Sequence, residues 1–203
     1  MPRRRTLIES PLEWAKAEGM TAAPVKPPLL PVVAERGGTQ IHAPKATVIV
    51  DTREQNPFSF ARFRGWFQGV RRKALQVGDY SIEGLEDHCT VERKDLPDLI
   101  HSFTTDRAVF VKRLRAMSRF PHRLLVVTAP LSVVKSRYGA FSTDPNRITQ
   151  SLIAALAGAE ITFLCVDTHE LGEEIVASYL YQIHLYHWLD ANDYGRYLAD
   201  QDL

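Results

Sequence analysis

Short apolar runs and helical apolar patterns alternate along the chain after about residue 45. β-branched or continuous apolar runs predict strands at residues 46–51, 73–79, 80–84, 88–94, 123–129 and 160–167. Apolar positions at helical spacing predict helices at residues 96–103, 106–120, 144–159 and 170–193. Strands come first and then alternate with helices, which predicts an α/β fold with a mixed central sheet flanked by helices.

The first 45 residues have a different composition. Seven of the twelve prolines fall there, and proline removes backbone donors and stiffens an extended chain. We therefore expect a Pro-rich N-terminal arm at residues 1–45 with one short helix near Trp14, which docks on the domain or on a protein partner. The folded domain is expected at residues 46–193, followed by a C-terminal tail at residues 194–203.

The composition says more about where the protein acts than about what it does. The net charge of +1 does not by itself indicate a nucleic-acid-binding protein, although a balanced total can hide a basic face. Cys89 and Cys165 lack the spacing of metal ligands, so buried reduced thiols are expected. No apolar run approaches the roughly 20 residues of a membrane span, and no secretory signal is visible. An intracellular, cytoplasmic protein without a membrane partner is expected.

Acidic residues follow three of the predicted strands. They are Asp51 with Glu54 three residues on, Asp79, and Glu92. Side chains at i and i+2 of a strand share a face, so Glu92 and Lys94 should project together, with Arg93 on the other side. Charges at the end of a strand also arise where the strand simply reaches solvent, and Asp, Glu and Lys are common residues. Converging carboxylates, however, repel one another unless a cation lies among them.

Such a group has the donors that a divalent ion requires. Carboxylate oxygens bind Mg²⁺ or Mn²⁺, and the ion lowers the pKa of a bound water and neutralises charge on a phosphate. A lysine beside the ion can orient or deprotonate the attacking water. Two explanations of these charges therefore stay open: a metal site of a phosphodiesterase, and a strand end that simply reaches solvent. The residues alone support the first without deciding the matter.

Three segments, 50–60, 77–82 and 91–103, together resemble the nuclease domain of the ERCC4 family, to which the XPF endonucleases belong. The family signature is Gly-Asp, a variable gap, Glu-Arg-Lys, three residues and Asp. Here it reads Gly78-Asp79, a twelve-residue gap, the run 92–94, and Asp98. The chain is similar to short standalone bacterial or phage members, because it has neither a helix-hairpin-helix motif nor a helicase loop.

The resemblance implies a restriction-endonuclease-like fold of the PD-(D/E)XK type and Mg²⁺- or Mn²⁺-dependent cleavage of DNA. By matched position, Asp79 and Glu92 would be direct metal ligands and Lys94 the catalytic lysine, with Asp51 and Glu54 as further metal-holding acids. It implies hydrolysis of phosphodiester bonds in branched, flap or nicked DNA, during repair, recombination or phage DNA processing. The alternative is a non-catalytic DNA-binding or scaffold subunit.

Further residues are expected to support the site or to bind DNA. The signature residues Arg93 and Asp98 are expected to be partly structural, pairing with each other or with Arg53. The supporting or DNA-binding set is Arg53, Arg93, Asp98, Arg107, Arg71 and Arg72. The remaining basic residues of helix 106–120, Lys112, Arg113, Arg115 and Arg119, are placed on its outer face, which contacts DNA phosphates or only solvent. The aromatic-rich last helix makes a homodimer a further possibility.

Overall fold

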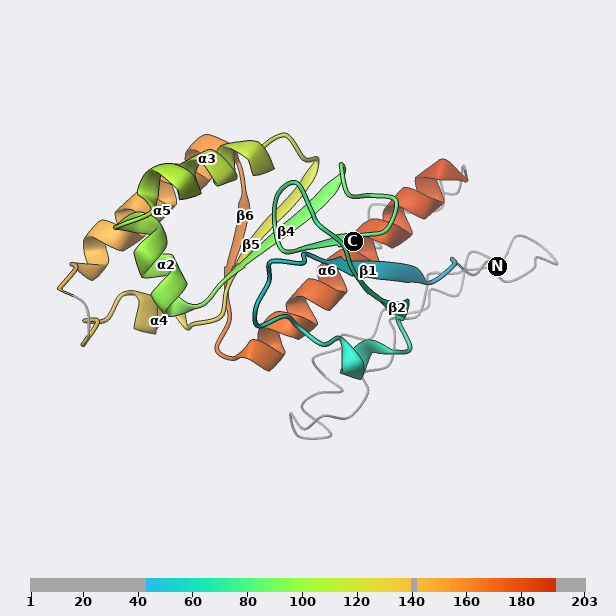
Figure 1. Cartoon of the computed structure of the whole chain (residues 1–203), viewed down its shortest axis with the longest axis horizontal. Coiled ribbons are helices and arrows are strands. Elements are labelled where there is room, and N and C mark those ends of the chain that lie inside the picture. The colour runs from blue at the N-terminus through green and yellow to red at the C-terminus, as the bar shows by residue number, and fades with distance from the viewer. Residues whose placement is uncertain (1–42, 140–141, 193–203) are drawn as a thin grey trace, which may run out of the picture.

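A six-stranded mixed sheet runs through the middle of the protein, with helices on both faces (Figure 1). The computed structural model describes residues 43–139 and 142–192. Most of the expected N-terminal arm, with its short helix, lies outside the described residues, and so does the expected C-terminal tail. Within the described part, no helix is long and apolar enough to cross a membrane.

The strands lie in the order β2-β1-β3-β4-β5-β6. Strand β1 pairs in parallel with β2 and antiparallel with β3, and β4 continues antiparallel to β3 before the parallel pairs β4–β5 and β5–β6. The predicted mixed sheet is thus confirmed. The strands are β1 (Ala46–Val50), β2 (Phe67–Arg72), β3 (Tyr80–Ile82), β4 (Cys89–Lys94), β5 (His122–Val127) and β6 (Thr162–Cys165).

Two helical layers enclose the sheet. Helix α6 packs on one face and α2, α3 and α5 pack on the other, as Figure 1 shows. Strand β5 illustrates the division, because Leu124 and Val126 join the α6 cluster while Leu125 and Val127 join the opposite cluster. The helices are η1 (Ala61–Phe63), α2 (Leu96–Phe103), α3 (Arg107–Met117), α4 (Leu131–Val134), α5 (Pro145–Ala159) and α6 (His169–Ala191).

Helix starts follow the capping residues in the sequence. The Asp95 carboxylate accepts a hydrogen bond from the backbone N–H of Asp98 at 2.9 Å, which begins α2 immediately after β4. The Asp144 carboxylate accepts from the backbone N–H of Asn146 and begins α5, with Pro145 at its first position as predicted. The cap of α2 fixes the direction in which the chain leaves the end of β4.

The strand predicted at residues 73–79 is wrong. This segment is a loop, and the strand that precedes it is β2, which lies parallel to β1 at the edge of the sheet. Most of β2 is exposed, so it lacks the apolar pattern that would have revealed it. The loop bends at Gly78, whose φ of 82° lies in the left-handed region, and its Leu75 N–H donates to a side chain rather than to a neighbouring strand.

Candidate active site

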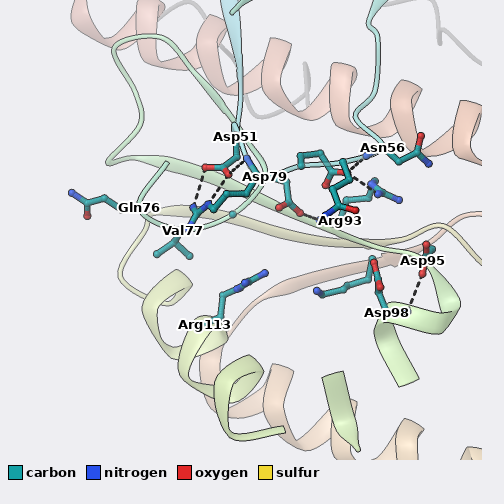
Figure 2. Close-up of a pocket in the computed structure, with 14 residues that line it drawn as sticks. Asp51, Asn56, Gln76, Val77, Asp79, Arg93, Asp95, Asp98 and Arg113 are labelled. Carbon is teal, nitrogen blue, oxygen red and sulfur yellow. Dashed lines mark hydrogen bonds and ion pairs between the residues drawn. The ribbon is translucent and has the colours of Figure 1, made fainter. Parts of the chain in front are cut away.

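A polar pocket of about 450 Å³ lies between the loop 73–79, the end of β4 and the helices α2 and α3 (Figure 2). Its walls come from five places in the sequence: the segment after β1, the loop before β3, the end of β4, Asp98 of α2, and Arg113 of α3. Nine of the eleven residues proposed from the sequence line this pocket or contact a residue that does. Arg71 and Arg107 do not.

Strand β4 divides its charges between the two faces of the sheet, as the strand period predicts. Glu92 and Lys94 project toward α3, with Lys94 Nζ 3.3 Å from Glu92 Oε1. Arg93 projects to the α6 side, where its guanidinium lies 5.9 Å from the centre of the Phe58 ring. The fold alone therefore brings Glu92 and Lys94 together, without a bound ligand.

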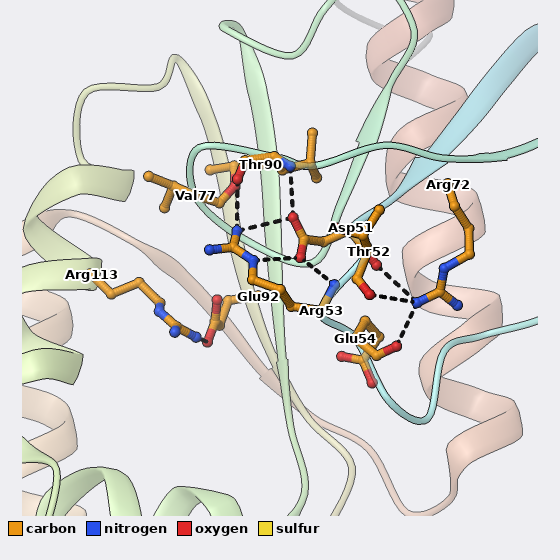
Figure 3. Close-up of polar contacts among 10 residues, drawn as sticks. Asp51, Thr52, Arg53, Glu54, Arg72, Val77, Thr90, Glu92 and Arg113 are labelled. Carbon is orange, nitrogen blue, oxygen red and sulfur yellow. Dashed lines mark hydrogen bonds and ion pairs between the residues drawn. The ribbon is translucent and has the colours of Figure 1, made fainter.

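Glu92 is fully buried, and two cations contact one of its oxygens. Arg113 Nη1 donates to Oε1 at 2.6 Å (Figure 3). Lys94 Nζ lies 3.3 Å from the same oxygen. The other oxygen, Oε2, is buried and has no hydrogen-bond partner. A buried carboxylate requires positive charge nearby, and here both cations contact the same oxygen, Oε1.

Arg113 was expected on the outer face of its helix, and it is exposed there, but its guanidinium also reaches the buried Glu92, which was not expected. The residue precedes the buried Leu114 and follows Phe110 by three positions, so it borders the apolar stripe of α3. A long arginine side chain can lie along such a stripe and deliver its head to a buried acid. That border position was the one signal in the sequence that could have indicated the contact.

The position of Asp79 depends on the glycine before it. Asp79 N–H donates to the Val91 carbonyl at 2.7 Å, and a β-carbon on Gly78 would lie 2.2 Å from Thr90 Oγ1 and 2.9 Å from the Val91 oxygen. Only glycine fits this approach of the loop to β4. The Asp79 carboxylate accepts the Arg93 N–H at 2.7 Å. Burial, followed by repulsion from Glu92, raises the pKa of Asp79 far above its ordinary value.

The two acids after β1 bind arginines, and Figure 3 shows the contact between Asp51 and Arg53. Asp51 accepts from Arg53 Nε and Nη2 at 2.8 and 3.0 Å and from the Leu75 N–H at 2.6 Å. Burial alone would raise the pKa of Asp51, but these donors outweigh it and the pKa falls to about 2. Glu54 accepts from Arg93 Nη2 at 2.9 Å and from the Asn56 N–H. Both carboxylates therefore hold the pocket wall together through arginines.

The other predicted supporting residues have distinct places. Arg72 Nη2 donates to the carbonyls of Asp51, Thr52 and Glu54, which fixes the segment after β1. Asp98 lines the pocket, but its expected partner Arg93 is bound to Glu54 instead. Outside the pocket, Arg71 pairs with Glu83 and Arg107 is an exposed residue at the start of α3. A DNA-binding role for these arginines stays a prediction.

Among the described residues, no group of three or more His, Cys, Asp or Glu side chains is placed to hold a metal ion by itself. Mg²⁺, however, commonly binds through one or two carboxylates and keeps several waters. Asp79 and Glu92 fit that requirement, because Glu92 Oε2 is unpartnered and the two carboxylates repel each other. The metal-ligand roles of Asp51 and Glu54 stay predictions.

The charges around the pocket also fit a divalent cation. The acids are Asp51, Glu54, Asp79, Asp95, Asp98 and the buried Glu92, and the cations are Arg53, Arg93, Lys94 and Arg113. Counted as ionised, six carboxylates face four cationic side chains, which leaves two negative charges unmatched. One Mg²⁺ or Mn²⁺ ion would balance them.

Comparison with known proteins agrees with this geometry. Residues 50–188 match the model of the ERCC4 domain. The fold is similar to XPF from Aeropyrum pernix, with a TM-score of 0.54, 17% identity, and coverage of 68% of this chain and 61% of that one. A structure of XPF from Aeropyrum pernix in complex with DNA gives a TM-score of 0.53, 20% identity, and coverage of 70% and 66%.

The chain thus spans less than two thirds of the length of either XPF structure. No curated protein gives a significant match. The family match nevertheless extends over more than half of the chain and includes every element that lines the pocket. The protein therefore belongs to the ERCC4 domain family, with an α/β fold that matches the XPF nuclease domain.

Proposed function

We propose that the protein is a metal-dependent DNA endonuclease that hydrolyses phosphodiester bonds. The observation that carries the proposal is that Asp79 and Lys94 line one pocket and that Lys94 contacts the buried Glu92, one of whose oxygens is left without a partner. A structural relative binds DNA, which supports DNA as the substrate class.

Asp79 and Glu92 would hold the Mg²⁺ or Mn²⁺ ion in this proposal. When bound, the ion supplies a more acidic water and stabilises negative charge on the scissile phosphate. Asp79 is held for this task by Gly78 and by the Arg93 N–H. Glu92 is held by Arg113. Both side chains are therefore oriented by the protein alone, so little reorganisation is needed when an ion binds.

Lys94 would act on the phosphate or on the attacking water. Its Nζ lies 5.2 Å from the centre of the Phe110 ring and its side chain is 14% exposed, so few waters compete for its protons. An ammonium held beside the metal ligands can donate a hydrogen bond to a phosphate oxygen as charge develops there. A lysine in this place can also orient the water, or accept its proton if the lysine first loses its own.

The same proposal extends to the preferred DNA and to the protein partners. Branched, flap or nicked DNA is proposed as substrate, with action inside the cell on DNA. A homodimer through α6 and a protein partner for the N-terminal arm are further parts of it. The polar pocket and the family match support DNA as the substrate, while the two protein contacts are proposed from the sequence alone.

The test is cleavage of duplex, nicked, flap and forked DNA with Mg²⁺ or Mn²⁺. Asp79→Asn keeps the side-chain shape and should abolish cleavage, while Asp190→Asn, an exposed aspartate of α6, should cleave like the wild type. Folded wild-type protein that binds these DNAs and cuts none of them would contradict the proposal and favour the non-catalytic DNA-binding subunit.

A further inference from the structure

We propose that Arg113 is a positioning residue that presents one chosen oxygen of Glu92 to the metal ion. By holding Oε1, Arg113 leaves Oε2 as the oxygen that binds the ion. This inference rests on the proposed metal-dependent function and extends it to α3, which lies outside the signature motif.

The first support is the unequal use of the two Glu92 oxygens. Arg113 Nη1 lies 2.6 Å from Oε1 and Lys94 Nζ lies 3.3 Å from the same atom. Oε2 is buried without a hydrogen-bond partner. Leaving a buried carboxylate oxygen unpaired is unfavourable, so the arrangement indicates a ligand that binds there. An ionised carboxylate oxygen can only accept, so the ligand at this oxygen must be a hydrogen-bond donor or a cation.

The second support is the rigidity of the element that carries Arg113. Phe110, Leu114 and Met117 anchor α3 in the core beside α2 and α5. The same Phe110 ring lies under Lys94. One anchored helix therefore contacts both members of the Glu-x-Lys pair, with Arg113 acting on Glu92 and Phe110 on Lys94.

The third support is that Arg113 lines the pocket while contacting Glu92. Its side chain is 41% exposed, and among the described residues Nη1 is the nitrogen for which a hydrogen bond is found. Its head group therefore lies between the pocket and the buried carboxylate. One donor is sufficient for the proposed task, so a lysine at the same position should replace it in part.

The test is the affinity for Mn²⁺ alone, measured by electron paramagnetic resonance titration of the full chain. Arg113→Met should weaken Mn²⁺ binding at least tenfold, while Arg113→Lys recovers part of the loss. Arg115→Met, which removes the same charge from an exposed site on the same helix, should bind Mn²⁺ like the wild type. Equal or tighter binding by Arg113→Met would overturn the inference.

A crystal structure of the wild type with Mn²⁺ tests the same point without a variant that has to fold. The ion should bind the Glu92 oxygen that does not contact Arg113, with the Arg113 contact retained. An ion on the Arg113 oxygen, with Arg113 displaced, would overturn the inference.

The outcomes separate this inference from the proposed function. Wild type that binds Mn²⁺ through the predicted oxygen and cuts no DNA would remove the proposed function only. Wild type that cuts DNA, with Arg113→Met binding Mn²⁺ normally, would remove the positioning role only. Wild type that binds no Mn²⁺ would remove both.

Discussion

Arg93 Nη2 donates to Glu54 Oε1 at 2.9 Å, which ties the middle residue of the β4 signature to the segment after β1. Both side chains are more than nine-tenths buried. The signature arginine thus joins the two halves of the pocket wall, while its own N–H holds Asp79.

Arg93→Met should destabilise the protein by about 3 kcal/mol, because removing one partner leaves the other charge buried and unpaired. The free energy of unfolding in urea measures the loss. Arg71→Met is the matched control, since the Arg71–Glu83 pair is exposed and should contribute at most about 1 kcal/mol. Equal losses in the two variants would contradict the assigned role of the Arg93–Glu54 pair.

Gly78→Ala should destabilise the protein more than Gly84→Ala and should also weaken Mn²⁺ binding. Both glycines have φ near the same left-handed value, at 82° and 84°. A β-carbon on Gly84 meets nothing within 4 Å, so that substitution carries only the backbone cost of about 1 kcal/mol. On Gly78 the β-carbon would collide with β4. Unfolding in urea and Mn²⁺ titration give the two comparisons, and indistinguishable variants would refute the steric account of Gly78.

Asp51 should give the protein a stability that is lost in acid. Its folded pKa of about 2 lies below the ordinary 3.8, so the folded state favours the charged form. The contribution is present above pH 3.8 and disappears as the pH falls toward 2. In Asp51→Asn the free energy of unfolding should be lower at neutral pH and should fall less steeply over this acid range. An unchanged slope would show that Asp51 is not the titrating group.

Mn²⁺ binding should strengthen as the pH rises toward the alkaline range. Burial and Glu92 raise the pKa of Asp79 in the metal-free protein, so at neutral pH a bound proton competes with the ion. Calorimetry in buffers of different ionisation enthalpy should detect protons released on binding. The Glu54→Gln variant, whose acid is bound to Arg93, should retain this release. Release of no protons by the wild type at neutral pH would contradict the assignment.

Lys94→Met should lower the rate of DNA cleavage by about 10² to 10⁴, the range expected when a positioned acid–base group is lost. DNA binding measured with Ca²⁺ should change little. Lys135→Met, an exposed lysine after α4, serves as the control for net charge. A Lys94→Met variant that cuts at the wild-type rate would exclude lysine from the chemistry.

Much of the fold is readable from the sequence because its buried elements carry strong patterns. The continuous apolar runs of β5 and the capped start of α5 were sufficient to locate them. Strand β2 was missed because edge strands with exposed polar residues have no apolar period. The segment 73–79 looked like a strand, yet its backbone direction is set by Gly78 and by a side-chain acceptor, neither of which a pattern reveals.

The candidate site was predictable only where it follows strand geometry. Glu92 and Lys94 share a face because strands alternate, so their pairing could be expected. The partners of Asp51, Glu54 and Glu92 are arginines whose reach depends on how loops and α3 pack. Long flexible side chains make such contacts across large sequence separations, and one-dimensional spacing does not encode them.

The Asp51 carboxylate accepts the Leu75 N–H, a role that a backbone carbonyl would have if this segment were a strand. Around Leu75, the loop that leads to Asp79 is therefore held at a distance set by the length of one side chain. Glutamate at position 51 would keep the charge and add a methylene, which would push the Leu75 loop outward. A substitution that keeps the charge at position 51 would therefore still change the pocket, because the shape of the pocket depends on the length of this side chain.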